Sequence, residues 1–472
     1  MPPPWPTTPP TARDRASFAD AEPRPYWAVQ TEPAPGLAGR ASADLCIVGA
    51  GFTGLWAALH AKHDDPARDV VVLEAETAGF GASSRNGGFL ASSLTHGLAN
   101  GLARFPDELD ALDRLGLENY RGLLADLDRL GVDCDLEETG EIDVATEPYQ
   151  LEELSEAAAL ARAHGHDVEL LDGTAMRAEV ASPLYLGGLW HRTGNALVDP
   201  GKLVDGLRRA ALATGVRLHE RTPVTGLGRT GAGVRVSTPG GAVEAGGVLL
   251  GTSAYPPPLR AIRRRVVAVY DYVLVTEPLS TAQWQAIGWR NRQGLADGGN
   301  RFHYYRPTAD GRILYGGFEA VYRYGGPVAA RLDDDEQTFS LLAQHFFATF
   351  PQLEGVRFSH RWGGAIDTCS RFSVYFGTAL GGRVAYAVGY TGLGVGATRF
   401  GARVALDLLD GRETEATQLR YVRTKPVPFP PEPLRSAVIQ LTRNRLAAAD
   451  RRQGRRGLWL RGLDRLGLGF DS

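Results

Sequence analysis

The stretch CIVGAGFTGLWAALH, residues 46–60, decides the architecture that this sequence predicts. Its first residues belong to a short apolar run of the β type at 45–48, and residues 55–61 carry apolar side chains at helical spacing. A second β-type run at 70–73 ends in Glu74. Strand, tight turn, helix and strand in this order make one βαβ unit, which predicts an α/β fold built on a parallel sheet.

The three glycines of the turn fit a dinucleotide-binding fingerprint. Gly49 permits the tight turn, Gly51 lets a pyrophosphate approach the backbone, and Gly54 lets the helix pack on the strand. The pyrophosphate then lies on free N–H groups at a helix N-terminus, and Glu74 is placed to accept hydrogen bonds from ribose hydroxyls. The predicted cofactor contacts in this unit are Gly49, Gly51, Phe52, Thr53, Gly54, Glu74 and Ala75. The alternative is a purely structural turn.

Two further glycine-rich loops favour FAD over NAD as the dinucleotide. The loop GFGASSRNGG at 79–88 is too long for a simple turn and is placed to pass beside a flavin. The loop GYTGLGVG at 389–396 opens a helix whose N-terminus favours the negative charge of a reduced flavin. The contacts predicted in these loops are Gly81, Ala82, Ser83, Ser84, Arg85, Asn86, Gly87, Gly88, Thr391, Gly392, Leu393, Gly394 and Val395. The alternative for 389–396 is a flexible hinge.

Length and composition set the class of protein. The chain has 472 residues, 43% hydrophobic and 22% charged, with a net charge of −3, which is typical of a globular protein without a nucleic-acid partner. The three cysteines have no metal-type spacing, so we expect no metal site. No apolar run approaches the roughly 18 residues of a transmembrane helix, and the start MPPPWPTTPP lacks the features of a secretory signal. We therefore expect a cytoplasmic protein with an extended, mobile N-terminal arm.

Several segments together resemble one family of flavoproteins. Besides residues 46–60 they are GFGASSRNGG (79–88), ALVDPGKLVDGLRRAA (196–211), YDYVLVTEPL (270–279), YYRPTADGRILYGG (304–317), WGGAID (362–367) and GYTGLGVGATRFGA (389–402). In this combination the chain is similar to the D-amino acid oxidase family, in the branch of gamma-glutamylputrescine and sarcosine oxidases. The resemblance covers most of the chain, from residue 25 to about 411.

The resemblance implies an interleaved fold. A Rossmann-like FAD-binding domain comprises 41–100, 190–255 and 355–412, and a mixed antiparallel-sheet substrate domain comprises 101–189 and 256–354. An N-terminal arm (1–40) and a C-terminal helical extension (413–472) flank them. The match adds Val224, Thr252 and Gly364 to the FAD contacts.

The resemblance also implies an activity. The enzyme is expected to oxidise a C–N bond of an amine or N-substituted amino acid by hydride transfer to flavin N5, giving an imine that hydrolyses. Oxygen or another electron acceptor then reoxidises the flavin. We expect the FAD to be non-covalent, because the surroundings of Cys369 match poorly the cysteine that tethers the flavin of sarcosine oxidases.

Two departures bear on the substrate and the acceptor. Glycine and D-amino-acid oxidases hold the substrate carboxylate with an arginine, and our alignment puts Ile366 in its place. Sarcosine oxidases activate oxygen with a lysine, whereas residues 203–424 contain none.

Catalytic candidates come from the aromatic stretch 302–305. In a strand, His303 and Tyr305 share one face, and Phe302 and Tyr304 share the other. His303 has a pKa suited to orienting the amine or taking its proton, and Tyr305 forms a pocket wall. Either Arg306 or Arg312 substitutes for the missing lysine. The alternatives are an ordinary strand histidine for His303 and core packing for Tyr305.

Two other functions and one feature of the tail stay open. The functions are flavin-dependent hydroxylation, for which a second nucleotide site is not evident, and a non-catalytic electron-transfer subunit. The arginine-rich residues 430–472 predict an amphipathic helix, either docked on the protein body or bound to an anionic membrane surface.

Overall fold

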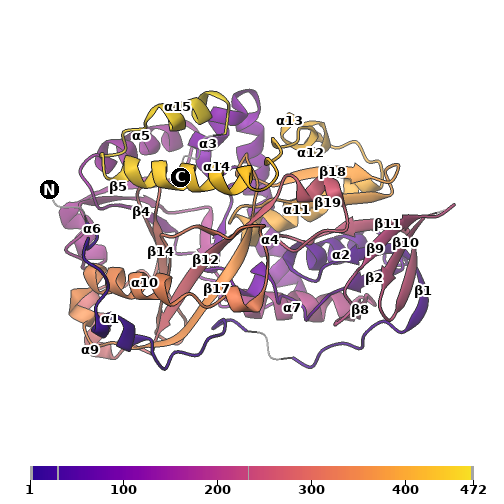
Figure 1. The fold of residues 1–472 in the computed structure, drawn as a ribbon, viewed down its shortest axis with the longest axis horizontal. Coiled ribbons are helices and arrows are strands. Elements are labelled where there is room, and N and C mark those ends of the chain that lie inside the picture. Colours follow the sequence, from indigo (N-terminus) through magenta and orange to yellow (C-terminus); the bar gives the residue numbers. More distant parts are fainter. Residues whose placement is uncertain (1–3, 29–30, 232, 469–472) are drawn as a thin grey trace.

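Two large sheets carry the fold of the computed structural model, which describes residues 4–28, 31–231 and 233–468 (Figure 1). One sheet is mainly parallel and the other mainly antiparallel, and the C-terminal part of the chain is helical. The predicted combination of an α/β nucleotide-type sheet, a mixed antiparallel sheet and a helical extension is confirmed.

The first sheet has eight strands within the described ranges. Its order is β18–β19–β11–β1–β2–β8, with β10 and β9 attached to β11. The strands are β1 (Gly39–Val48), β2 (Val70–Leu73), β8 (Arg217–His219), β9 (Gly226–Arg229), β10 (Val234–Thr238), β11 (Gly241–Leu250), β18 (Tyr375–Ala379) and β19 (Val384–Val388). Leu45 and Ile47 enter the core on one face, while Cys46 and Val48 enter the core on the other. Because both faces are covered, the β1 sequence ends in a continuous apolar run.

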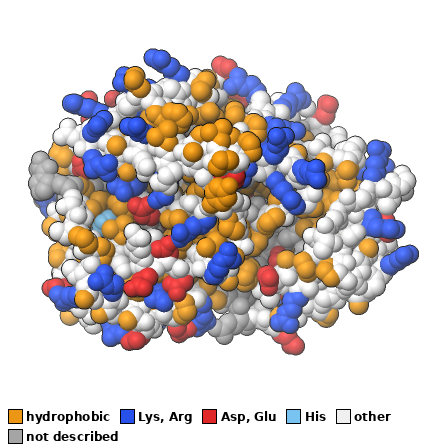
Figure 2. Space-filling model, in the orientation of Figure 1, with side chains coloured by type: hydrophobic (Ala, Val, Ile, Leu, Met, Phe, Trp, Pro, Cys, Tyr) orange, Lys and Arg blue, Asp and Glu red, His pale blue; other side chains and the backbone are white. Residues whose placement is uncertain are grey.

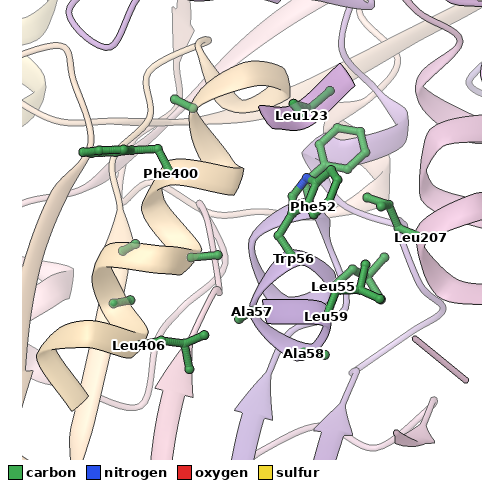
Figure 3. Close-up of a cluster of buried hydrophobic side chains, with 14 of the residues drawn as sticks. Phe52, Leu55, Trp56, Ala57, Ala58, Leu59, Leu123, Leu207, Phe400 and Leu406 are labelled. Carbon is green, nitrogen blue, oxygen red and sulfur yellow. The ribbon is translucent and has the colours of Figure 1, made fainter. Parts of the chain in front are cut away.

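Three helices pack on one face of this sheet: α2 (Phe52–Asp64), α7 (Pro200–Ala213) and α11 (Gly394–Leu409). Figure 3 shows Trp56 of α2, Leu207 of α7 and Phe400 of α11 within one buried cluster. A fully buried side chain of this size contributes about 1.5–3 kcal/mol, so the shared cluster holds the three helices against the sheet. Both helices begin at the carboxyl ends of parallel strands.

The second sheet has nine strands in the part of the chain described. Its order is β16–β12–β15–β14–β13–β4–β6–β5, and β17 pairs with β12. The strands are β4 (Glu141–Ala145), β5 (Val168–Asp172), β6 (Gly187–His191), β12 (Val267–Thr276), β13 (Gly294–Asp297), β14 (His303–Pro307), β15 (Ile313–Gly317), β16 (Val321–Tyr322) and β17 (Phe358–Thr368). The predicted boundary at residue 355 assigned the β17 residues to the nucleotide-binding part, whereas β17 pairs with β12 over ten positions of the second sheet.

One face of the second sheet is covered by α10 (Glu336–Thr349). Tyr272, Tyr305 and Tyr315 from the sheet pack with Phe339 and Phe346 of this helix. The remaining strands β3 (Phe89–Ala91) and β7 (Asn195–Leu197) pair with each other. The remaining helices are α1 (Ala12–Ser17), α3 (Gly97–Arg104), α4 (Leu109–Leu130), α5 (Gln150–Ala163), α6 (Gly173–Glu179), α8 (Arg260–Arg263), α9 (Thr281–Ile287), α12 (Glu415–Gln418), α13 (Arg420–Arg423), α14 (Leu434–Asp450) and α15 (Leu458–Arg465).

The N-terminal arm packs on the protein body, which differs from the mobile arm expected. Within its described residues it forms α1 and buries Phe18 and Trp27, and Trp5 stacks on His345. The proline content of this segment predicted a mobile arm, but these apolar side chains pack it on the protein body. No helix among the described residues has the length and apolar character needed to cross a membrane.

Candidate active site

A continuous cavity of about 990 Å³ runs from the carboxyl ends of β1, β2, β11 and β19 to the second sheet. A ligand site at this edge is the rule for open α/β sheets. Twenty of the predicted cofactor contacts line the cavity: Gly49, Gly51, Phe52, Thr53, Glu74, Ala75, Gly81, Ala82, Ser83, Arg85, Asn86, Gly87, Val224, Thr252, Gly364, Thr391, Gly392, Leu393, Gly394 and Val395. Gly54, Ser84 and Gly88 lie behind this lining. The three loops singled out in the sequence therefore meet at one cavity.

The fingerprint turn is as tight as its glycines predict. Gly49 has φ +102°, and a Cβ there would lie 2.6 Å from the Gly251 carbonyl oxygen. A Cβ on Gly54 would lie 1.8 Å from the Gly49 carbonyl oxygen, so Gly54 acts by allowing α2 to pack. Helix α2 begins without a side-chain cap, and its Phe52 N–H donates to the Ser83 hydroxyl at 2.9 Å. The N-terminal N–H groups of α2 are thus directed at the cavity, as in an anion site.

Glu74 holds the same turn from the end of β2. Its carboxylate accepts hydrogen bonds from the backbone N–H of Ala50 at 2.7 Å and of Glu76 at 3.0 Å. Burial raises the pKa of Glu74, and the side chain lines the cavity. It can therefore fix the turn and accept further hydrogen bonds from a ligand there.

Two tryptophans fix the 79–88 loop. The Trp27 indole N–H donates to the Asn86 carbonyl at 2.9 Å, and the Trp362 indole N–H donates to the Arg85 carbonyl at 3.0 Å. The Arg85 guanidinium pairs with Asp333 at 2.9 Å. Contacts from the N-terminal arm, β17 and the loop before α10 thus position one cofactor loop, which sequence proximity did not indicate.

Asp367 fixes the other loop. Its carboxylate accepts a hydrogen bond from the Gly389 N–H at 2.7 Å, and its backbone carbonyl accepts one from the Thr391 N–H at 3.2 Å. Burial raises the pKa of Asp367 to about 6, against the lowering effect of these N–H donors. Helix α11 then begins at Gly394 without a side-chain cap. Its first residues line the cavity, so its N-terminus faces it.

His303 and Tyr305 lie on the face of β14 that is turned away from the cavity. His303 is fully buried. Its Nδ1 shares a hydrogen bond with the Asp297 carboxyl group at 2.8 Å, and its Nε2 shares one with Nδ1 of His345 at 3.0 Å. The Tyr305 hydroxyl accepts from Tyr185 at 2.9 Å. Neither residue is among those that line the cavity, so the geometry favours the packing alternative for both.

Arg306 is a structural tether. Its guanidinium donates to the carbonyl oxygens of Val198 at 2.6 Å, Pro307 at 2.9 Å and Gly88 at 3.2 Å, and it is 1% exposed. Desolvation lowers its pKa to about 10. The group fixes the end of the 79–88 loop and does not reach the cavity.

The cavity face of the second sheet presents Tyr304 and Asp271 instead. The Tyr304 hydroxyl donates to Asp271, whose other oxygen accepts the Tyr272 N–H at 2.9 Å. Burial raises the pKa of Asp271 to about 6. The Tyr304 ring lies against the cofactor loop, because a Cβ on Gly87 would meet it at 2.6 Å. Tyr304 and Asp271 are therefore a hydrogen-bonded pair of titratable groups in the cavity lining, and Tyr304 contacts the predicted flavin loop.

The comparisons with known proteins agree with this geometry. A family model described as FAD dependent oxidoreductase matches residues 44–408. The chain belongs to this family of FAD-dependent oxidoreductases. It is 35% identical over 378 residues to the gamma-glutamylputrescine oxidoreductase of Escherichia coli K12, covering 78% of this chain and 84% of the relative.

Solved structures show the same fold for this FAD-dependent oxidoreductase. The glycine oxidase of Geobacillus kaustophilus superposes with a TM-score of 0.66 at 21% identity, covering 79% of this chain and 96% of that one. The iminodiacetate oxidase of Chelativorans sp. BNC1 gives 0.65 at 17% identity, covering 80% and 98%. The expectations of family, fold and enzyme class are confirmed.

The residues of the cavity fit FAD. The N-termini of α2 and α11 both face it, and neither helix is capped by the side chain of its own N-cap residue. Thr252 and Thr398 line it with buried hydroxyls that have no hydrogen-bond partner among the described residues. Uncapped N–H groups and unpaired hydroxyls are the donors that phosphate and flavin oxygens require.

Cys369 lies outside the cavity lining. It is fully buried in the core below the first sheet, and its thiol donates to the Ser373 carbonyl at 3.2 Å. In the described ranges no cluster of three His, Cys, Asp or Glu side chains is arranged to hold a metal ion.

Sequence reasoning placed Tyr304 in the aromatic stretch of the pocket but not among the catalytic candidates, and it missed Asp271 and the C-terminal helices as parts of the cavity lining. A signal for Asp271 was present, since it is the single charged residue within the run VAVYDYVLVT of β12. A lone acid inside a buried strand needs a partner or a function.

Proposed function

We propose that this enzyme oxidises the C–N bond of an amine, and that Asp271 and Tyr304 receive the amino group. The observation that carries the proposal is the Asp271–Tyr304 pair on the cavity face, beside the 79–88 loop. A buried carboxylate with a phenol donor attracts an ammonium group and has a pKa suited to proton transfer.

The charges around the cavity favour an amine over a simple α-amino acid. The arginines that line it in the described part of the chain all have carboxylate partners: Arg85 with Asp333, Arg301 and Arg443 with Glu319, and Arg456 with Asp464. Ile366 also lines the cavity, at the position where related oxidases are expected to hold a substrate carboxylate. A substrate carboxylate near the reacting carbon would therefore lack a free cation.

The chain's own residues prepare the amine. An alkylammonium with a pKa near 10 must lose its proton before the nitrogen lone pair can assist, which costs about 4 kcal/mol at pH 7. Burial lowers the pKa of the ammonium group and raises the pKa of Asp271, so the difference between the two pKa values becomes smaller. Asp271 then accepts the proton, and Tyr304 orients the carboxylate.

Bound FAD would supply the two-electron acceptor, at N5, for the hydride that leaves the α-carbon. The contacts proposed to hold it are the α2 and α11 N-termini, Glu74 and the 79–88 loop. The substrate becomes an imine, which water hydrolyses to a carbonyl compound and ammonia or a smaller amine. A non-covalent FAD is part of the proposal, supported by the buried position of Cys369.

Anaerobic mixing of the holoenzyme with a panel of amines tests the proposal. We expect at least one amine to bleach the oxidised-flavin absorbance without any other reductant, and Asp271→Asn to slow that bleaching. Bleaching by NADPH but by no amine would favour a hydroxylase. A flavin that neither NADPH nor any amine reduces would favour a non-catalytic electron-transfer subunit.

A further inference from the structure

The C-terminal helices α14 and α15 line the same cavity as the flavin loops. Along α14 the lining residues Val438, Thr442 and Leu446 recur at every fourth position, with Ile439 and Arg443 beside them. This spacing puts one face of the helix toward the cavity. Leu460 and Leu463 of α15 join this lining. Both helices follow residue 408, where the family match ends.

Polar contacts hold α14 to the second sheet at both ends. Before its first turn, Glu432 accepts a hydrogen bond from the Tyr322 hydroxyl at 2.6 Å. At its last turn, Asp450 accepts bonds from the backbone and side-chain nitrogens of Asn300 at 2.9 and 2.7 Å. Between them Arg443 pairs with Glu319. These contacts give the helix a defined position against β16 and the loops that precede β14 and β16.

Helix α15 packs on α14. The Trp459 indole N–H donates to the Thr442 hydroxyl at 3.1 Å, and Leu460 is buried. Figure 2 shows apolar side chains among basic ones over the region where Figure 1 draws these helices. The inward side chains Val438, Ile439, Leu446, Leu460 and Leu463 are apolar, and Arg443 is paired with Glu319.

We propose that α14 and α15 form the distal wall of the substrate site and select amines that carry an apolar chain of several carbons, with Ile439 and Leu463 in contact with that chain. This inference rests on the proposed amine oxidation, because Asp271 receives the amino group while the chain extends toward the helices. Asp271 and Ile439 line the same cavity, and two arginines of its lining, Arg301 and Arg443, are both paired with Glu319.

A series of straight-chain primary amines of two to eight carbons tests the wall on the holoenzyme. The half-saturating concentration is read from the bleaching rate where an amine reduces the flavin, and from the perturbed flavin spectrum where it does not. Each methylene buried on the wall should lower this concentration about fourfold, which corresponds to about 0.8 kcal/mol per buried CH₂. Failure of the oxidation itself would leave this length dependence measurable.

Three variants decide the assignment. Ile439→Ala and Leu463→Ala should each raise the half-saturating concentration of the longest amines about fivefold and leave that of ethylamine unchanged. Gln440→Ala, on the exposed side of α14, is the matched control and should behave as the wild type. An affinity independent of chain length in the wild type would overturn the proposal. Equal behaviour of all three variants toward long amines would overturn it as well.

Discussion

The Tyr304 hydroxyl donates a hydrogen bond to the carboxylate of Asp271 across the width of one intervening strand, β15, on the face that lines the cavity. The bond lowers the pKa of Asp271, and burial raises it more, to about 6. The Tyr304 ring lies against Gly87 of the loop predicted to contact the flavin.

This pair predicts an acidic limb in the pH profile. Below pH 6 Asp271 is protonated and no longer attracts an ammonium group, so kcat/KM for an amine should fall as the pH drops through about 6. Asp271→Asn should lower kcat/KM at pH 7 about 100-fold and remove this limb. Steady-state kinetics from pH 5 to 9 provide the measurement.

Removal of the Tyr304 hydroxyl should move the same limb. Tyr304→Phe deletes a donor to the Asp271 anion, so the limb should shift to higher pH. Tyr305→Phe is the matched control, because that hydroxyl bonds to Tyr185 behind the sheet and its loss should leave the limb in place. A shift of the acidic limb caused by Tyr305→Phe and not by Tyr304→Phe would indicate that the catalytic groups lie on the other face of β14.

The tryptophan at position 362 should matter for cofactor affinity. Trp362→Phe removes the bond to the Arg85 carbonyl, and a net loss of about 1 kcal/mol corresponds to about fivefold weaker FAD binding. Trp289→Phe removes a comparable bond, to the Gln293 carbonyl at 2.9 Å, between two residues that do not line the cavity. Titration of the apoproteins with FAD should distinguish the two variants. Equal Kd values for both would contradict a role of the Trp362 hydrogen bond in positioning the 79–88 loop.

The fingerprint turn should tolerate no side chain at position 49. Gly49→Ala combines a φ of +102° with a contact of 2.6 Å to the Gly251 carbonyl, so we expect a loss of about 2 kcal/mol or more in stability together with loss of FAD. Gly228→Ala, with open space around its Cβ, should change the stability by less than about 0.5 kcal/mol. Thermal unfolding and the flavin content of the purified variants measure both effects.

The flavin should leave the protein on denaturation. Cys369 is buried away from the cavity lining, and burial raises the pKa of its thiol, which makes it a poor nucleophile. Acid precipitation should give a colourless pellet and a yellow supernatant, and Cys369→Ser should bind as much flavin as the wild type. A yellow pellet from the wild type and a colourless one from Cys369→Ser would identify a covalent bond.

The cofactor side of the site was predictable because its signals are local. Gly49, Gly51 and Glu74 act at fixed spacings within one βαβ unit, and the 79–88 and 389–396 loops are themselves rich in glycine. The structure brings these segments to one cavity, and the glycines dictate the backbone geometry of their turns.

The substrate side was not predictable in the same way. Alternation along β14 separated His303 and Tyr305 from Phe302 and Tyr304, but it does not say which face meets the cavity; α10 decides that by covering the first pair. Of the partners of His303, Asp297 lies six residues away at the end of β13, whereas His345 and Trp5 come from distant segments. The same holds for α14, whose position depends on Asn300 and Tyr322.

A crystal structure of the holoenzyme with a slowly reacting amine bound tests the central claim most directly. We predict one FAD along the 49–54 turn and the 79–88 and 389–396 loops, with the amine nitrogen within hydrogen-bond distance of the Asp271 carboxylate. An amine bound on the His303 side of β14, or a flavin remote from these loops, would contradict the account.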